Sequence, residues 1–134
     1  MVAWPVEPLN PNPSVLITDD SAAWRNAVGD ILERAGFRAI EAASGEEAIE
    51  VVRTERLDII LMDFHMPRLD GIETLRIIRR TEHWLPAVLV TGHPEELPQD
   101  AVRALRVHTV LHKTADREVI VTTVTRVVRP EPRP

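Results

Sequence analysis

Three aspartates are the residues whose type and position point most directly to chemistry. Asp19 and Asp20 follow the short apolar run 14–18, and Asp63 ends a second apolar run that begins at Leu57. Three like charges in one small cleft repel each other, so such a group indicates either raised pKa values or a bound cation. Oxygen-only ligands favour a hard ion, and Mg²⁺ suits an open site that retains water and shares a phosphate. An aspartate pair at a loop start is, by itself, more often a helix cap.

Two further residues fit the same chemistry. Thr91 ends the apolar run 87–90, where its hydroxyl can donate to a phosphoryl oxygen, and Lys113 follows the run 107–112 and offers a compact positive charge to the same oxygens. Taken singly, Thr91 reads equally well as a turn residue and Lys113 as a surface lysine. The hypothesis therefore depends on the whole set, which together would perform phosphoryl transfer to a carboxylate.

The segments before these residues predict alternating strands and helices. Apolar residues from Trp24 to Ala35 recur at the spacing of a helix with one buried face, and Gly36 supplies its stop. Ser44 and Glu47 have the spacing of a capping box. Strands are expected at 14–18, 37–41, 57–62, 87–90 and 107–112, with helices at about 24–35, 44–54, from 71, near 98, and at 116–128.

Five strands alternating with five helices predict an α/β fold: a doubly wound five-stranded parallel sheet with helices on both faces. Right-handed crossovers and the common flavodoxin-like order 2-1-3-4-5 place the first strand between the second and the third. Functional sites in such folds lie at the carboxyl ends of the strands. Asp19, Asp20 and Asp63 are therefore expected to meet there.

Composition narrows the class of protein. The 134 residues suffice for one domain, and the Pro-rich segments 1–13 and 130–134 are predicted to be flexible ends around a domain at 14–129. The absence of cysteine favours a reducing compartment, and no segment approaches the ~20 apolar residues of a membrane span. A formal net charge of −5 argues against nucleic-acid binding. We expect a cytoplasmic protein without direct nucleic-acid or membrane contacts.

The ordered set of motifs resembles the receiver domain of two-component response regulators. The matching pieces, in order, are Asp19-Asp20, Met62-Asp63-Phe64-His65-Met66-Pro67, Asp70-Gly71, Val90-Thr91-Gly92 and Lys113. The resemblance implies that Asp63 is the phosphoacceptor, that Asp19, Asp20 and Asp63 hold Mg²⁺ with the main-chain carbonyl of His65, and that Thr91 and Lys113 contact the phosphoryl group.

The same resemblance implies partners rather than turnover of a substrate. The donor is expected to be a phosphohistidine on a sensor histidine kinase or a histidine phosphotransfer protein. The signal would pass to a downstream protein, or to an output domain if the chain is a piece of a longer regulator. The domain is expected to assist its own phosphorylation and dephosphorylation without being an enzyme.

Two positions depart from the family pattern. Receivers usually carry Tyr or Phe three residues before the lysine, where this chain has Val110, and usually Pro after it, where this chain has Thr114. Val110 puts the usual aromatic switch in doubt and supports the alternative of a receiver-like binding module that works without phosphorylation. Because a non-proline cis bond costs ~3 kcal/mol, the Lys113–Thr114 link is predicted to be trans.

Two histidines occupy positions that, in the family, tune loss of the phosphoryl group: His65 and His93. One hypothesis is that they make the phosphoryl lifetime depend on pH between about 5 and 8, and the other is that they are incidental loop residues. His65 also argues against an aspartyl-intermediate phosphatase, which would carry an acid there. The acidic segment after the first strand argues against a flavodoxin-like nucleotide-binding protein.

Overall fold

Five short strands form one parallel sheet in the computed structural model, which describes residues 11–130. The sheet order is β2-β1-β3-β4-β5, as predicted, with β2 and β5 at the edges. The strands are β1 (Ser14–Thr18), β2 (Arg38–Ala42), β3 (Ile59–Asp63), β4 (Ala87–Thr91) and β5 (Thr109–His112).

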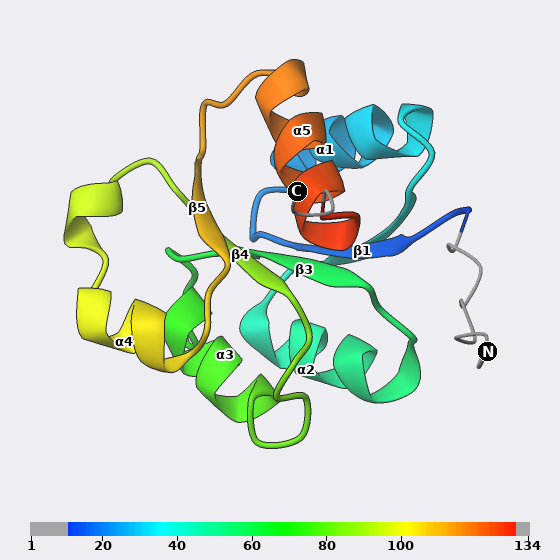
Figure 1. Cartoon of the computed structure of the whole chain (residues 1–134). Helices are drawn as coiled ribbons and strands as arrows, with labels where there is room; N and C mark the ends of the chain where they lie inside the picture. The colour runs from blue at the N-terminus through cyan, green and yellow to red at the C-terminus, as the bar shows by residue number, and fades with distance from the viewer. Residues whose placement is uncertain (1–10, 131–134) are drawn as a thin grey trace, which may run out of the picture.

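Helices cover both faces of the sheet, with α1 and α5 on one side and α2, α3 and α4 on the other (Figure 1). The helices are α1 (Ala22–Arg34), α2 (Gly45–Thr54), α3 (Gly71–Ile78), the 3₁₀ turn η1 (Pro94–Glu96), α4 (Gln99–Ala104) and α5 (Arg117–Val128). The doubly wound fold class is confirmed.

The apolar pattern of the strands decides how the layers pack. All five residues of β1, β3 and β4 are buried, as expected for central parallel strands covered on both faces. Alternate residues point to opposite sides, so Leu16 and Ile60 pack toward α2 and α3 while Ile17 and Leu61 pack toward α1 and α5. The rigid centre of the sheet therefore carries the strand ends that bear the predicted site.

The ends of α1 and α4 explain why β2 and β5 begin later than the strands predicted from the sequence. Gly36, with a φ of 97°, follows α1, and the N–H groups of Gly36 and Phe37 donate to the carbonyls of Glu33 and Leu32. The strand predicted at 37–41 consequently begins one residue later. At the end of α4, the N–H of Val107 donates to the carbonyl of Val102, and Arg106 has a left-handed φ of 56°. Because Val107 takes part in ending the helix, β5 starts at Thr109 and not at 107.

Side-chain caps fix the helix starts near the strand ends. Ser44 accepts from the N–H of Glu47, as its spacing predicted. A full reciprocal capping box occurs at α3, where Asp70 accepts from the N–H of Glu73 and the Glu73 carboxylate accepts from the N–H of Asp70. Pro98 immediately precedes the short α4, close to its predicted start.

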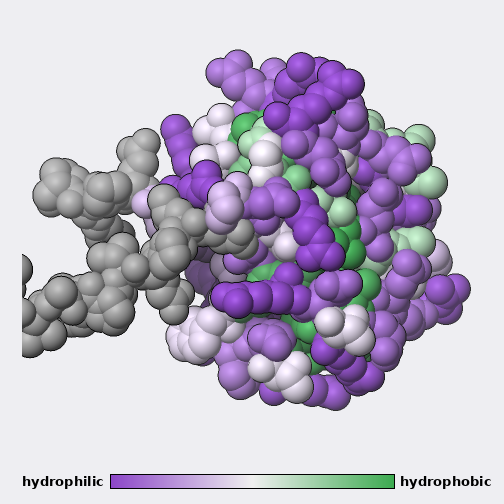
Figure 2. Space-filling view, turned by 90° about the vertical axis from the view of Figure 1, so that its right-hand side faces the viewer, coloured by the Kyte–Doolittle hydropathy of each residue, from purple (hydrophilic) through white to green (hydrophobic). Residues whose placement is uncertain are grey.

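The two termini of the sequence are largely outside the described residues. The flexible ends predicted at 1–13 and 130–134 fall there except for residues 11–13 and Pro130, and the Pro13 carbonyl accepts a hydrogen bond from Arg38 at the edge of the sheet. None of the helices in the described part of the chain is long and apolar enough to cross a membrane. Figure 2 views the end where the chain enters β1, and hydrophilic residues dominate that surface.

Candidate phosphoacceptor pocket

The three predicted carboxylates meet at the carboxyl ends of the two central strands. Asp19 directly follows β1 and Asp63 is the last residue of β3, its neighbour in the sheet. One carboxylate oxygen from each of Asp19, Asp20 and Asp63 lies within 4.8 Å of the others. Asp19 has no exposed surface, Asp63 is 4% exposed and Asp20 is open to solvent. Two buried acids with one exposed acid make a pocket that is closed at its base and open at its mouth.

Main-chain and side-chain bonds hold Asp19 in place. Its Oδ1 accepts from the N–H of Ser21 at 2.8 Å, and its own N–H donates to the carbonyl of Ala42 at 3.1 Å. The Arg25 guanidinium donates to the Asp19 carbonyl at 2.7 Å. The Ser21 N–H therefore orients the carboxylate, while bonds to β2 and α1 fix the Asp19 backbone.

Lys113 neutralises part of the buried charge. Its Nζ forms an ion pair with Asp19 Oδ2 and lies 3.4 Å from Asp63 Oδ2. Lys113 is the only lysine in the sequence, and every other residue in the Lys and Arg count is an arginine. A small ammonium can sit between two carboxylates where the wider, planar guanidinium would need more room. The position of this amine argues against the alternative of an ordinary surface lysine.

Trp24 supports the lysine, and sequence reasoning missed this role. Its Nε1 donates to the Lys113 carbonyl at 3.3 Å, and the Lys113 Nζ lies 4.5 Å from the centre of its ring. A cation over an aromatic face is stabilised electrostatically. The sequence placed Trp24 only on the buried stripe of its helix, because no local motif signals a contact with a residue 89 positions away.

The protonation of Asp63 reflects its surroundings. Burial, followed by the charge of Asp19, raises the pKa of the Asp63 carboxyl to about 6, and Lys113 and the main chain of His65 act in the opposite direction. The carboxylate is thus mostly ionised at neutral pH. A cation bound among the aspartates would favour the ionised form further.

Thr91 ends β4 next to this pocket and is fully buried. Its Oγ1 accepts from the N–H of His93 at 3.0 Å, and its carbonyl accepts from the N–H of Lys113 at 2.9 Å. Because the hydroxyl acts as an acceptor in the first bond, its hydrogen remains available for an oxygen in the pocket. The second bond ties Thr91 to the strand end that carries the lysine.

Gly71 explains one of the sequence motifs in physical terms. A Cβ at this position would overlap the carbonyl oxygen of Asp63 and crowd Phe64, and the Gly71 N–H donates to the Phe64 carbonyl at 2.9 Å. Any side chain here would push the loop away from the strand end. The glycine therefore lets α3 start directly beneath the phosphoacceptor position.

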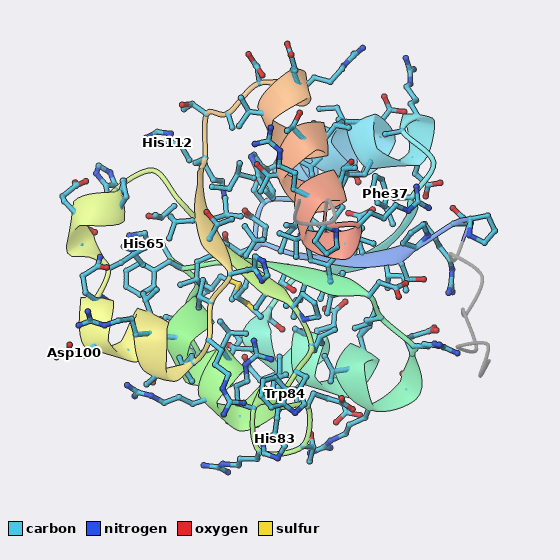
Figure 3. The ribbon with its side chains drawn as sticks, in the orientation of Figure 1. Phe37, His65, His83, Trp84, Asp100 and His112 are labelled. Carbon is cyan, nitrogen blue, oxygen red and sulfur yellow. The ribbon has the colours of Figure 1, made fainter. Side chains whose placement is uncertain are left out.

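The two departures from the family pattern lie within β5, at Val110, and just after it, at Thr114. Val110 is half-buried and packs against the cluster under α2, α3 and α4. No cis peptide bond occurs among the described residues, so the predicted trans link between Lys113 and Thr114 is confirmed. Phe37 lies far from β5, beneath α1 (Figure 3).

The fold and the pocket together define a receiver: an α/β sheet of order 2-1-3-4-5 with an acidic cluster, a threonine and a lysine at its strand ends. Residues 15–125 match the family described as the response regulator receiver domain. The chain therefore belongs to the family of response regulator receiver domains.

Similar proteins agree with this membership. Transcriptional regulatory protein AfsQ1 of Streptomyces coelicolor is 40% identical over 85 residues, 63% of this chain and 37% of that protein. The CAI-1 autoinducer sensor kinase/phosphatase CqsS of Vibrio cholerae is 29% identical over 109 residues, 79% of this chain and 16% of that protein. This chain thus spans less than two fifths of either relative.

Solved structures give the same fold over nearly the whole chain. The structure of chemotaxis protein CheY4 of Vibrio cholerae superposes with a TM-score of 0.81 at 29% identity. The superposition covers 87% of this chain and 98% of that one. The likeness therefore extends over most of the chain.

Proposed function

We propose that this receiver accepts a phosphoryl group on the carboxylate of Asp63, with Mg²⁺ held by Asp19, Asp20, Asp63 and the main-chain carbonyl of His65. The observation that carries the proposal is the position of the Lys113 amine, which contacts both buried aspartates. A cation placed between a nucleophile and a second acid matches the charge that develops on a transferring phosphoryl group.

The reaction needs little beyond positioning. An oxygen of Asp63 attacks the phosphorus of a phosphohistidine, and the P–N bond breaks as the new O–P bond forms. The donor imidazole leaves with the electron pair and becomes neutral by taking up a proton. The Lys113 ammonium and the Thr91 hydroxyl stabilise charge on the equatorial oxygens. The open mouth at Asp20 and Gly92 leaves room for the donor.

The donor set fits magnesium. Three carboxylates converge within 4.8 Å, they are oxygen ligands, and one of them is exposed so that water can complete the coordination. When bound, Mg²⁺ would neutralise charge on the phosphoryl oxygens and bring the acids together without repulsion. The hydrogen bond from the His65 main chain to Asp63 brings that residue's backbone close to the acids.

Partners follow from this chemistry. A phosphohistidine donor is supplied by a sensor histidine kinase or a histidine phosphotransfer protein, and these act in the cytoplasm. Receivers occur within larger proteins, as the short coverage of AfsQ1 and CqsS illustrates. We propose that phosphorylation changes the affinity of this chain for a downstream protein or for an output domain of its own protein, without catalytic turnover of another substrate.

One observation favours a second function. Val110 replaces the aromatic residue of the usual switch, so phosphorylation at Asp63 would lack that route to the face formed by α4, β5 and α5. A phosphorylation-independent binding module would have this feature. The contacts of Lys113 with the two buried acids favour the first function, because burying these charges costs desolvation energy and phosphoryl chemistry gives them a role.

Intact-mass analysis after incubation with acetyl phosphate and Mg²⁺ separates the two functions. We expect the native chain to gain one phosphoryl group and Asp63→Asn to gain none. Asp58→Asn is a matched control, because Asp58 lies before the start of β3 and outside the pocket. Uptake by Asp63→Asn would place the acceptor elsewhere, and no uptake by the native chain would favour the binding module.

A further inference from the structure

A second group of metal-binding side chains lies beside the pocket, in the segment between β4 and α4. One donor atom from each of His93, Glu95 and Glu96 lies within 4.8 Å of the others. His65, from the segment between β3 and α3, joins them, with its Nε2 3.1 Å from Glu96 Oε2. Figure 3 shows the His65 side chain beside the η1 turn. Two imidazoles and two carboxylates from separate segments therefore face each other.

The distances suit donors to one small ion. Ligands about 2.1 Å from a tetrahedral Zn²⁺ lie roughly 3.4 Å from each other. His93 Nδ1 and Glu95 Oε1 are 3.3 Å apart, close to this spacing, as are His65 and Glu96. The rings of His65 and His93 meet edge to face, with 6.4 Å between their centres. Three donors thus already lie within one 4.8 Å set, and His65 reaches that set through its contact with Glu96.

The backbone of this turn is already ordered. The His93 N–H donates to Thr91 Oγ1, and the Glu96 N–H donates to the His93 carbonyl at 3.0 Å. Pro94 restricts the first residue of η1, and Leu97 anchors the end of the turn with only 4% of its surface exposed. Three of the four donors consequently leave one fixed turn, which lowers the entropy lost when an ion binds.

We propose that the side chains of His65, His93, Glu95 and Glu96 bind a divalent transition-metal ion of the zinc class, beside the proposed magnesium site, to which His65 contributes only its main-chain carbonyl. Imidazole nitrogens prefer such ions to Mg²⁺, whereas the three aspartates offer only oxygens. Two glutamates supply charge to balance the ion. The donors are accessible, since the His65 and His93 side chains are 54% and 64% exposed.

The alternative is two surface pairs, each a histidine bonded to a glutamate. Isolated pairs of this kind contribute little and need no common centre. The grouping of His93 with both glutamates within one 4.8 Å set distinguishes the cluster from such pairs. His112 lies near enough to influence Glu95 electrostatically, which adds a third imidazole to the neighbourhood.

Zinc titration of the full chain in saturating Mg²⁺ tests the site, because under the proposed function Mg²⁺ fills the oxygen-only pocket. We expect one equivalent of Zn²⁺ to bind, and His93→Ala or Glu96→Gln to weaken that binding by about tenfold or more. His83→Ala is the matched control, since His83 is exposed at the opposite end of the molecule (Figure 3). Its binding should equal that of the native chain.

Co²⁺ gives an independent readout, because absorption bands in the visible range report its ligand geometry. The bands should appear with the native chain and with Asp63→Asn, and should be lost with His93→Ala. The persistence of binding in Asp63→Asn separates this proposal from the proposed function. The proposal would be wrong if His83→Ala weakened metal binding as much as His93→Ala, or if Zn²⁺ bound without a one-equivalent endpoint.

Discussion

The pocket side of the sheet and the side formed by α4 and β5 differ in how firmly they are built. Every residue of β1, β3 and β4 is buried, whereas only Leu111 is buried in β5 and none within α4. Asp19 is held by bonds from β2 and α1, and Thr91 and Lys113 are tied together through the backbone. The half-buried Val110, by contrast, packs only at the margin of a core cluster.

This difference separates two tasks. The acids and Thr91 of the pocket stand at the ends of the central strands β1, β3 and β4, whereas Lys113 follows the edge strand β5 and is tied to Thr91 by a backbone hydrogen bond. Val110 and Thr114, the two departures from the family pattern, lie within and just after β5, and we propose that this side of the molecule suits a particular partner. We therefore expect substitutions in the pocket to affect both stability and phosphorylation, and substitutions near α4 and β5 to affect neither strongly.

Lys113→Ala should have the largest effect. It leaves buried Asp19 and Asp63 without their cation, which costs about 3 kcal/mol in the free energy of unfolding at pH 7 and abolishes most phosphoryl uptake. Arg103→Ala, which removes an exposed α4 partner of Asp100, should cost roughly 0.5 kcal/mol or less. Urea unfolding and intact-mass analysis measure the two quantities. A similar loss of stability in Lys113→Ala and Arg103→Ala would contradict the proposed difference between the pocket and the side formed by α4 and β5.

Gly71→Ala should come next. Its new methyl group overlaps the Asp63 carbonyl, so we expect the free energy of unfolding to fall by about 1–3 kcal/mol and phosphoryl uptake to slow. Gly29→Ala is the matched control within α1, where a methyl group would meet Ile17 and Ala39 at ordinary contact distances of 3.7 and 3.8 Å. This control should stabilise the protein by roughly 0.5–1 kcal/mol because alanine favours the helix. Thermal unfolding of both variants checks the prediction.

Asp63→Asn should stabilise the metal-free protein at neutral pH. Since the pKa of Asp63 is raised to about 6, its stabilising contribution is complete below the unfolded value of 3.8 and is lost as pH rises through about 6. The free energy of unfolding of the variant should therefore exceed that of the native chain by about 3 kcal/mol at pH 7 to 8, the equivalent of the shift from 3.8 to about 6. That gain should shrink between pH 6 and 4. Urea unfolding in EDTA across this range measures it, and a gain independent of pH contradicts the assignment.

Val110→Ala should have the smallest combined effect on stability and phosphoryl uptake among the four principal substitutions, the control variants apart. Loss of two half-buried methyl groups costs roughly 1 kcal/mol in the free energy of unfolding, and phosphoryl uptake should equal that of the native chain because the Val110 side chain packs against the core cluster under α2, α3 and α4 and not in the pocket. Denaturant unfolding measures the free energy of unfolding, and the acetyl phosphate assay measures phosphoryl uptake. A loss of uptake comparable to that of Lys113→Ala would show that the two sides of the sheet are not independent.

The fold was predictable because periodic patterns dominate it. Continuous apolar runs indicate central strands, and the order of parallel strands brings Asp19, Asp20 and Asp63 to one edge. Strand starts were less predictable, since β5 begins late only because Val107 closes α4 through a backbone bond. Such bonds depend on how a helix ends, which hydrophobic patterns do not encode.

The candidate site was predictable in its residue types and less so in its contacts. The approach of Asp19 to Asp63 follows from strand order alone. The support that Trp24 gives to Lys113, and the approach of His65 to Glu96, depend on side chains from distant segments. No local spacing signals these pairs. The role of the His65 carbonyl, the pH-dependent phosphoryl lifetime and the domain limits at 14 and 129 stay predictions.

The dependence of phosphoryl uptake on Mg²⁺ tests the central claim most directly. Intact-mass time courses with acetyl phosphate over a series of Mg²⁺ concentrations would give the rate for the native chain and for Asp20→Asn, whose acid is exposed at the pocket mouth. The account predicts a saturable rate that vanishes in EDTA, and a higher Mg²⁺ requirement in the variant. Uptake at an undiminished rate in EDTA would contradict it.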